Sequence, residues 1–398
     1  MLPDTAPLVA IVLPPREGFG PGRTGAVGLI VRRLADAPGF RSVVIGGPQA
    51  GPTFPDVAFR EARPPIWLPG NANVRHAAGV VRLVRSLRPA LIEVHNRTET
   101  ALALARWLPD ARIVLFLHND PQSMRQARTP AERTTLLRRM ALVVTVSAYL
   151  RDRLMEGVTA SVPPPAVLPN CIDLAALSLL PPPYGRPEPS PGPPWGREYP
   201  SGAPDELPQE PRAQEILFVG RVVPEKAPDA FVAACAVALP KLPGWRATII
   251  GADRFRADSP DTAFVRSVRA GAEAAGVRML GYRDHPEVLA ALTRAAIAVV
   301  PSRWQEPFGL TALEAMASGA ALIASPRGGL PEVAGDAALY ADPDDPPAIA
   351  AAIVALATDQ PRREALAAAG RERAKRFDLA PTLRHLAALR TALLAGGG

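Results

Sequence analysis

The sequence predicts an α/β protein built from two Rossmann-like, doubly wound domains that face a central cleft. Three observations support this: the length of 398 residues, short apolar segments that alternate with helical patterns, and a proline-rich stretch after which the alternation restarts. A chain of this length exceeds one ordinary hydrophobic core, and alternating strands and helices form parallel sheets covered on both faces. We therefore expect two sheets in tandem.

The first half contains five strand candidates. Each is a continuous apolar run, as buried parallel strands are. They are LVAIVLP (8–14), SVVIGG (42–47), LIEVH (91–95), RIVLFLH (112–118) and LVVTVS (142–147). Helical patterns lie between them, most clearly over residues 74–87. We predict a first domain over residues 1–162.

The same alternation restarts at residue 215 with EILFVG and continues through WRATIIGA, VRML, AIAVVPS and AALIAS. We predict a second domain over residues 215–375 and a C-terminal helix, 376–398, that packs back on the first domain. Residues 163–214 are expected to form a linker or insertion, because proline lacks the donor that a sheet needs. Proline content leaves open whether 181–213 is an irregular segment or an ordered flap.

Composition excludes several classes of protein. A hydrophobic fraction of 48% with 21% charged residues indicates a folded globular chain. The two cysteines form no disulfide framework and show no metal-ligand spacing. No apolar run approaches the roughly 20 residues that a membrane-spanning helix needs. We expect a cytoplasmic protein in a reducing compartment.

The positive charge lies in the first half. Residues 1–170 hold 21 arginines and 12 acidic residues, a balance of +9, and the rest of the chain is near neutral. A phospholipid surface, a lipid pyrophosphate and nucleic acid are candidate anionic partners. Nucleic acid is the weakest of them, because aromatic residues are only 5% and no zinc-finger or RRM pattern occurs. We expect an anionic membrane surface as a partner, through peripheral association with the inner membrane, and no nucleic acid.

The loop after the first strand, PREGFGPGRTGAVG (15–28), is rich in glycine. Gly22 and Gly25 would let a phosphate approach the start of the next helix, and Arg16 and Arg23 lie in the same loop. A G-x-G-x-x-G spacing occurs here, but the second strand lacks the acidic residue expected of an NAD site. A merely flexible loop remains an alternative, and no NAD cofactor is expected.

The fourth predicted strand ends in LFLHNDP, which places His118, Asn119 and Asp120 at the cleft. Ligands of open α/β sheets bind at the carboxyl ends of strands. We favour a site role for His118 over the alternative, a buried structural histidine.

In the second half, LFVGRVVPEK ends a strand with Gly220 and Arg221, and Lys226 follows five residues later. The chain has only three lysines against 42 arginines, so a lysine here suggests a compact point charge for phosphate. Two cations at one strand end suit a diphosphate.

The stretch PSRWQEPFGLTALEAMAS (301–318) places Glu306 in a loop and Glu314 about one turn inside a helix. The backbone amides of Phe308, Gly309 and Leu310 would hold a phosphate at the helix start. Glu314 could accept both hydroxyls of a ribose, and Glu306 would lie nearer to a donor sugar. The alternative is that acidic residues are simply common near helix N-termini.

The run E-P-F-G-L-x-x-L-E-A-M-A-x-G (306–319) resembles the signature of retaining family-4 glycosyltransferases. Further matches are FVGR and PEK within 218–226, GGLPEV (328–333) and LPNCID (168–173). The resemblance is specific mainly over 216–345, whereas the first half matches through its glycine loop, VHNR (94–97) and HNDP (118–121).

The resemblance implies the GT-B fold and a retaining, metal-independent transferase without a cofactor. Its donor would be a UDP- or GDP-sugar and its acceptor a glycan or a lipid-linked molecule, in bacterial polysaccharide or lipopolysaccharide synthesis. The resemblance implies catalytic roles for His118, Glu306, Arg221 and Lys226. It implies donor binding by Gly22, Gly25, Gly220, Arg221, Lys226, Leu280, Tyr282, Glu306, Phe308, Gly309, Leu310 and Glu314. It implies acceptor binding by Arg16, Arg23, Asn119 and Asp120. The acidic pair Asp342 and Asp344 is interpreted as a turn and helix cap, not as a metal site.

Two alternatives remain. One is a GT-B nucleotide-sugar 2-epimerase, and the other is a non-catalytic module that binds a nucleotide or a polyanion. The sequence does not determine the donor sugar, the acceptor or the linkage.

Overall fold

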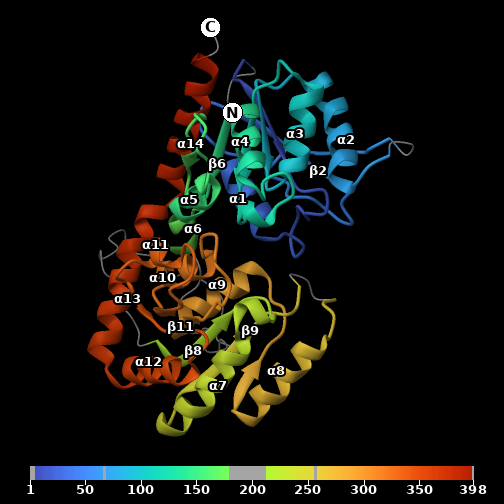
Figure 1. Cartoon of the computed structure of the whole chain (residues 1–398). Coiled ribbons are helices and arrows are strands. Elements are labelled where there is room, and N and C mark those ends of the chain that lie inside the picture. The colour runs from blue at the N-terminus through green and yellow to red at the C-terminus, as the bar shows by residue number, and fades with distance from the viewer. Residues whose placement is uncertain (1–4, 66–68, 179–211, 255–257, 397–398) are drawn as a thin grey trace, which may run out of the picture.

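The computed structural model describes residues 5–65, 69–178, 212–254 and 258–396. It contains two α/β domains, each built on one parallel sheet, which lie one above the other in Figure 1. The predicted α/β architecture is therefore confirmed. Residues 179–211 of the linker or insertion predicted over 163–214 lie outside the described residues.

The first sheet has the order β3-β2-β1-β4-β5-β6-β7. Its strands are β1 (Leu8–Val12), β2 (Arg41–Gly46), β3 (Phe59–Glu61), β4 (Leu91–His95), β5 (Ile113–Leu117), β6 (Leu142–Thr145) and β7 (Ala166–Val167). All five predicted strands are present. The two strands that the sequence analysis did not identify, β3 and β7, are too short to show a pattern, and β7 carries this sheet beyond residue 162.

Helices cover both faces of the first sheet because successive strand residues point to opposite sides. Ala10 and Val12 of β1 belong to a cluster with residues of α2, α3 and α4, whereas Val9 and Ile11 face α1. The helices of this part of the chain are α1 (Ala26–Leu34), α2 (Ala72–Leu87), α3 (Thr98–Trp107), η1 (Pro121–Ser123), α4 (Pro130–Arg139), α5 (Ala148–Met155) and α6 (Leu174–Ser178).

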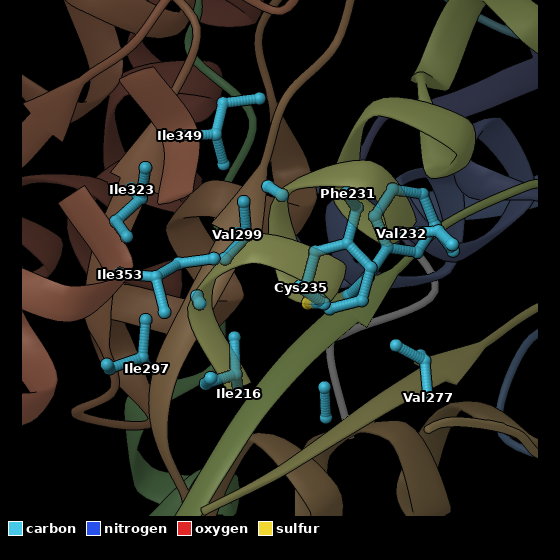
Figure 2. Close-up of a cluster of buried hydrophobic side chains, with 14 of the residues drawn as sticks. Ile216, Phe231, Val232, Cys235, Val277, Ile297, Val299, Ile323, Ile349 and Ile353 are labelled. Carbon is cyan, nitrogen blue, oxygen red and sulfur yellow. The ribbon is translucent and has the colours of Figure 1, made fainter. Parts of the chain in front are cut away.

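The second sheet has the order β10-β9-β8-β11-β12-β13. Its strands are β8 (Ala213–Val219), β9 (Arg246–Ile250), β10 (Val277–Met279), β11 (Ala295–Val300), β12 (Ala321–Ala324) and β13 (Ala338–Tyr340). Figure 2 shows the core on one face, where Ile216, Ile297 and Val299 of the sheet pack among Phe231 and Ile353 from helices.

The helices of the second domain are η2 (Pro224–Lys226), α7 (Pro228–Ala238), η3 (Leu239–Lys241), α8 (Ala263–Ala274), α9 (His285–Arg294), α10 (Leu310–Ala317), α11 (Leu330–Ala334), α12 (Pro346–Thr358), α13 (Gln360–Ala374) and η4 (Lys375–Phe377). Helices α7 and α12 cover the face drawn in Figure 2. Among the described helices, none is long and apolar enough to cross a membrane.

The last helix, α14 (Leu379–Ala395), leaves the second domain and lies along the first (Figure 1). Its Arg390 guanidinium donates two hydrogen bonds of 2.7 Å to the Glu93 carboxylate of β4. Both side chains are almost completely buried. Losing either partner would leave the other charge buried and unpaired, at a cost of about 3–5 kcal/mol. This ion pair therefore fixes the C-terminal helix to the sheet of the first domain.

Two further contacts join the domains beside the cleft. The Ser147 hydroxyl donates to the Pro307 carbonyl at 2.6 Å. The Glu332 carboxylate accepts from the backbone amides of Ala148 and Tyr149, at 2.8 and 3.0 Å, at the start of α5. A carboxylate is stabilised at a helix N-terminus by the exposed N–H groups there.

Each sheet reverses its strand order at one point, between β1 and β4 in the first and between β8 and β11 in the second. Such switch points open a crevice at the carboxyl ends of the strands, and ligands of open α/β sheets bind there. The fold therefore offers two candidate sites that face the same inter-domain region.

Candidate active site

A cavity of about 500 Å³ lies between the domains at the switch point of the second sheet. It brings together most of the residues that were predicted from the sequence to bind the donor. Those that line it are His118, Asn119, Gly220, Arg221, Lys226, Tyr282, Glu306, Phe308, Gly309, Leu310 and Glu314. Helix α1 closes the first-domain side through Ala26, Val27 and Ile30. Asn170, in the LPNCID motif, also lines the cavity, although we gave it no role from the sequence.

The ends of β8 and β9 approach each other closely in the floor of the cavity. Gly251 has φ +146, and a Cβ placed on it would lie 1.8 Å from the Gly220 carbonyl oxygen. Only glycine fits this position, since any side chain would collide with rigid backbone. The close approach aligns the loop that carries Arg221 and the turn η2 that carries Lys226.

Glu306 is the centre of a buried polar cluster. Its Oε1 forms an ion pair with Lys226 Nζ and accepts a hydrogen bond of 2.6 Å from the Ser302 hydroxyl. The Glu306 side chain is only 8% exposed, whereas that of Lys226 is 28% exposed. Both side chains line the cavity, and the lysine is the more exposed of the two. Ser302 was not identified from the sequence, because its hydroxyl becomes relevant only when the loop folds back on η2.

An arginine outside the cavity fixes the loop that carries Glu306. The Arg303 guanidinium makes two bonds to the Asp229 carboxylate, at 2.8 and 2.9 Å, and one of 2.8 Å to Asp344. Asp342 accepts from the Asp344 amide at 3.0 Å, and both aspartates lie within ion-pair distance of Arg327. The D-x-D pair thus anchors arginines of the second domain.

Helix α10 begins at the cavity with exposed donors. Gly309 is its N-cap, at φ +102, and provides no side-chain hydrogen bond to the first turn. The first N–H groups of an uncapped helix carry partial positive charge and can hold an anion. Glu314 lies one turn later, and its Oε1 is 2.7 Å from His285 Nε2. His285 was missed from the sequence because it comes from α9, which α10 meets only in the fold.

His118 follows β5 and is 8% exposed. Its Nε2 lies 2.9 Å from Nδ1 of His95, the last residue of β4, and its backbone amide donates to Asn96 Oδ1 at 3.2 Å. Burial lowers the pKa of His118 to about 4, so the imidazole is neutral at pH 7. His118 is thus both buried and part of the cavity wall, which combines the two interpretations that the sequence left open.

The glycine loop of the first domain differs from expectation. The partly buried Glu17 carboxylate lies at the start of α1, where Oε1 accepts from the Gly28 amide at 3.1 Å. Burial raises the pKa of Glu17. A Cβ on Gly25 would lie 2.8 Å from the same oxygen. Because the protein's own carboxylate occupies this helix N-terminus and Gly25 does not line the donor cavity, the structure does not support the donor-phosphate role that we predicted for Gly25.

Gly22 instead contacts the second domain. The Tyr282 hydroxyl lies 3.2 Å from the Gly22 carbonyl and 3.1 Å from Asp284 Oδ1. Gly22 does not line the donor cavity, so the structure does not support a donor-phosphate contact there. Leu280 is also absent from the cavity wall and packs against the hydrophobic core, with its amide donating to Ile249.

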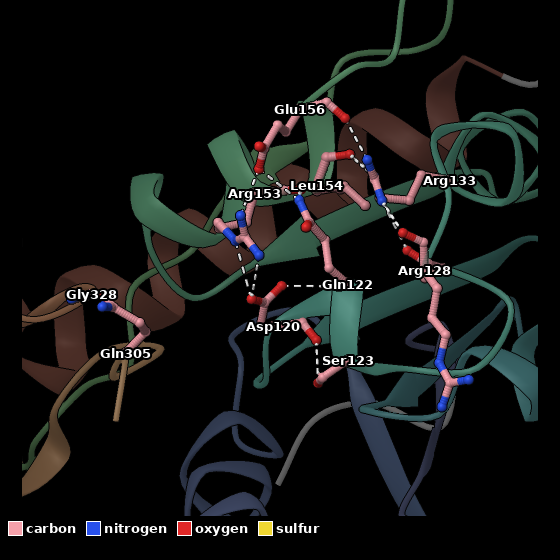
Figure 3. A network of polar contacts seen from close by, with 11 residues as sticks. Asp120, Gln122, Ser123, Arg128, Arg133, Arg153, Leu154, Glu156, Gln305 and Gly328 are labelled. Atoms are coloured by element: carbon pink, nitrogen blue, oxygen red, sulfur yellow. Dashed lines mark hydrogen bonds and ion pairs between the residues drawn. The ribbon is translucent and has the colours of Figure 1, made fainter. Parts of the chain in front are cut away.

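The four residues predicted to bind the acceptor do not lie together in one site. Asn119 lines the inter-domain cavity and Arg16 a second cavity in the first domain, whereas Arg23 lines neither and packs near Gly51. Asp120 is paired with Arg153 at 3.0 Å and caps the turn η1 through the Gln122 amide (Figure 3). This network occupies both carboxylate oxygens, so a direct acceptor contact from Asp120 is not supported.

Two family models match the chain. The model of glycosyltransferase family 4 covers residues 27–176, and that of glycosyl transferases group 1 covers residues 204–373. A glycogen synthase of Mycobacterium tuberculosis is 29% identical over 322 residues, which are 76% of this chain and 69% of that enzyme.

Solved structures share the fold over nearly the whole length. A sucrose-phosphate synthase from Thermosynechococcus elongatus superposes with a TM-score of 0.73 at 20% identity, covering 98% of this chain and 100% of that one. HepE of Anabaena, solved with UDP and glucose, gives a TM-score of 0.69 at 18% identity over 96% of this chain and 99% of that one. The chain therefore belongs to the group 1, family 4 glycosyltransferases of GT-B fold, as its motifs predicted.

Proposed function

We propose that the protein transfers a sugar, with retention of anomeric configuration, from a nucleoside-diphosphate sugar held in the inter-domain cavity to a glycan or lipid-linked acceptor. The observation that supports this most directly is the convergence of Arg221, Lys226, Glu306 and Glu314 with His118 of the other domain around one cavity. HepE, which shares the fold, was solved with UDP and glucose, so a UDP-sugar is the first donor to test.

Each side chain would have a distinct role. Arg221, Lys226 and the first amides of α10 would hold the diphosphate, where negative charge grows as the sugar bond breaks. Glu314 would accept the ribose hydroxyls. Glu306 would contact the donor sugar while it positions Lys226. Arg221, Lys226 and the α10 amides would face the leaving phosphate and would therefore stabilise the transition state more than the ground state.

No divalent metal is needed in this proposal, because two cations and a helix N-terminus supply the charge that balances the diphosphate. The departing phosphate would take the proton of the attacking acceptor hydroxyl, on the face of the sugar that it leaves. Closure of the domains would keep water from the donor.

A panel of UDP-, GDP- and ADP-sugars, each measured for thermal stabilisation and for release of nucleoside diphosphate with and without EDTA, tests the proposal. We expect one nucleotide class to stabilise the protein, and EDTA to leave turnover unchanged. The anomeric configuration of the product follows from its proton NMR couplings. Free UDP with an epimerised sugar in the absence of an acceptor would indicate a 2-epimerase, and binding without turnover would indicate a non-catalytic module.

We also propose peripheral association with anionic membranes. Arg82 and Arg85 are exposed on α2, which lies at the outer side of the first domain in Figure 1. Each basic residue near an anionic surface contributes about 1 kcal/mol, and this attraction is screened by salt. Flotation with phosphatidylglycerol vesicles should exceed that with phosphatidylcholine vesicles and fall as salt rises; equal flotation would contradict the proposal.

A further inference from the structure

A second cavity, of about 360 Å³, lies within the first domain. It sits at the switch point of the first sheet, because its wall includes Pro15 and Arg16 after β1 and Asn96 and Arg97 after β4. Crevices at such points are the usual ligand sites of doubly wound sheets. The cavity at the switch point of the second sheet is the proposed donor site, whereas this cavity, at the first sheet, has no assigned ligand.

The wall of this cavity is cationic. Arg16, Arg97 and Arg125 line it, against one acidic residue, Glu99. The oxygens of Glu99 are already bound: Oε1 accepts from the Asn71 amide group at 2.8 Å and Oε2 from that of Asn73 at 2.6 Å. Arg125 approaches Glu99 only to 4.0 Å. Glu99, together with Glu17 outside the wall, acts on Arg97, but three arginines against one carboxylate leave the wall with a net positive charge.

Two further features favour an anion. Helix α3 begins at this cavity with Arg97 as its N-cap and without a side-chain hydrogen bond to its first turn, so its first amides add partial positive charge. Arg97 is partly buried, and burial lowers its pKa. A guanidinium that has lost part of its water gains more from an anionic partner than an exposed one does.

A hydrogen bond joins the wall of this cavity to the wall of the donor cavity. Asn96 lines the first-domain cavity, and its Oδ1 accepts from the backbone amide of His118, which lines the donor cavity, at 3.2 Å.

We propose that this arginine cavity holds a phosphate group of the acceptor, so that the enzyme glycosylates a phosphorylated molecule. The proposal rests on the proposed function, because the molecule bound here is an acceptor only if the second cavity holds a nucleotide-sugar. Planar guanidinium groups suit phosphate, since each can donate two parallel hydrogen bonds. A soluble sugar phosphate and a lipid phosphate share this chemistry.

The binding experiment uses inorganic phosphate as the probe. All proteins carry Lys226→Gln, which weakens phosphate binding in the donor cavity, and phosphorus NMR line broadening measures the dissociation constant. The double change Arg16→Gln with Arg125→Gln should weaken binding about tenfold or more, because each lost charged hydrogen bond contributes at least that much. The matched control is Arg128→Gln. Arg128 is exposed, does not line the cavity, and points its guanidinium away from the neighbouring network in Figure 3.

The kinetic experiment uses otherwise wild-type protein with UDP-glucose. Acceptors are neutral hexoses, hexose phosphates, and a polyprenyl phosphate in phosphatidylcholine vesicles. The double change should raise KM for the phosphorylated acceptor about tenfold or more, whereas Arg128→Gln should not. Transfer to the hexose phosphate indicates a soluble source, and transfer to the vesicle phosphate indicates a lipid source.

Phosphate binding by the double variant within twofold of the Arg128→Gln control would overturn the inference, as would transfer to neutral hexoses alone. If the protein neither binds nor hydrolyses any nucleotide-sugar, the proposed function fails by itself. The phosphate titration still decides in that case whether the arginine cavity is an anion site.

Discussion

Replacement of His118 tests whether the first domain contributes a catalytic side chain to the donor cavity. The ring bonds to His95 Nδ1 at 2.9 Å, and His95 Nε2 is buried without a partner among the described residues. A proton on that Nε2 would be an unsatisfied buried donor, which is the costlier arrangement. His95 Nδ1 therefore donates to His118 Nε2, and the proton of neutral His118 resides on Nδ1, available to a sugar hydroxyl in the cavity.

His118→Ala should reduce both kcat and the free energy of unfolding, and the two effects can be measured separately. Removing a donor aimed at the transition state costs about 2.7–4 kcal/mol, or a 10²–10³-fold loss in kcat. Removing the partner of buried His95 costs a further 1–3 kcal/mol of folding free energy, which lowers Tm by about 2–4 °C for each kcal/mol in a domain of this size. The Kd for UDP should stay within about twofold of wild type, because His118 belongs to the domain opposite the nucleotide.

His95→Phe is the matched control. It removes the same hydrogen bond but keeps a ring stacked on Phe116, where the centroids of His95 and Phe116 lie 4.5 Å apart. Initial rates of UDP release, calorimetric Tm and titration with UDP are measured on the same preparations. If His118→Ala turns over as fast per folded molecule as His95→Phe does, the histidine serves only the core and its catalytic assignment is wrong.

Three further predictions concern single side chains. Glu314→Gln should weaken UDP and the UDP-sugar alike, by about tenfold, since a ribose contact is present in both; unchanged calorimetric affinity for UDP would refute the assignment. Glu306→Gln should reduce transfer at least 100-fold yet leave Kd for UDP equal or lower, because it frees the charge of Lys226; a tenfold weaker Kd would contradict this. His76 has a pKa lowered by burial from 6.5 to about 4, so stability is complete above pH 6.5 and falls towards pH 4. This histidine alone should lower the free energy of unfolding by about 2 kcal/mol at pH 5. Urea unfolding of wild type and His76→Gln at pH 5 and pH 7 should therefore show a smaller pH dependence of stability in the variant.

The sequence was informative where one short segment contained both a strand end and its polar residues. Arg221, Lys226, Glu306 and Glu314 follow β8 and β11, which are neighbours in the sheet, and the carboxyl ends of parallel strands meet at one edge. Their convergence could therefore be predicted from strand ends alone.

The sequence was least informative where a residue's role depends on a distant partner. In α10, residues 312–316 are all buried rather than one stripe of the helix, because α9, α11 and α13 surround it. Local periodicity cannot report how many neighbours a helix has. Strand β13 was missed for the related reason that three residues show no period.

Glu17 and Glu332 illustrate the same limit in a way that bears on mechanism. Each is a carboxylate at a helix N-terminus, Glu17 at α1 within its own loop and Glu332 at α5 across the domain boundary. By contrast, α10 and α3 begin without a side-chain cap, and both of these helices open onto a cavity. An N-terminus that already holds a carboxylate has little further affinity for an anion, whereas an uncapped one retains it. Helix α1 also follows a strand at a switch point, but Glu17 already occupies its start. Among these four helices, only α10 and α3 therefore begin beside a cavity without a carboxylate or other side-chain cap bonded to their first turn.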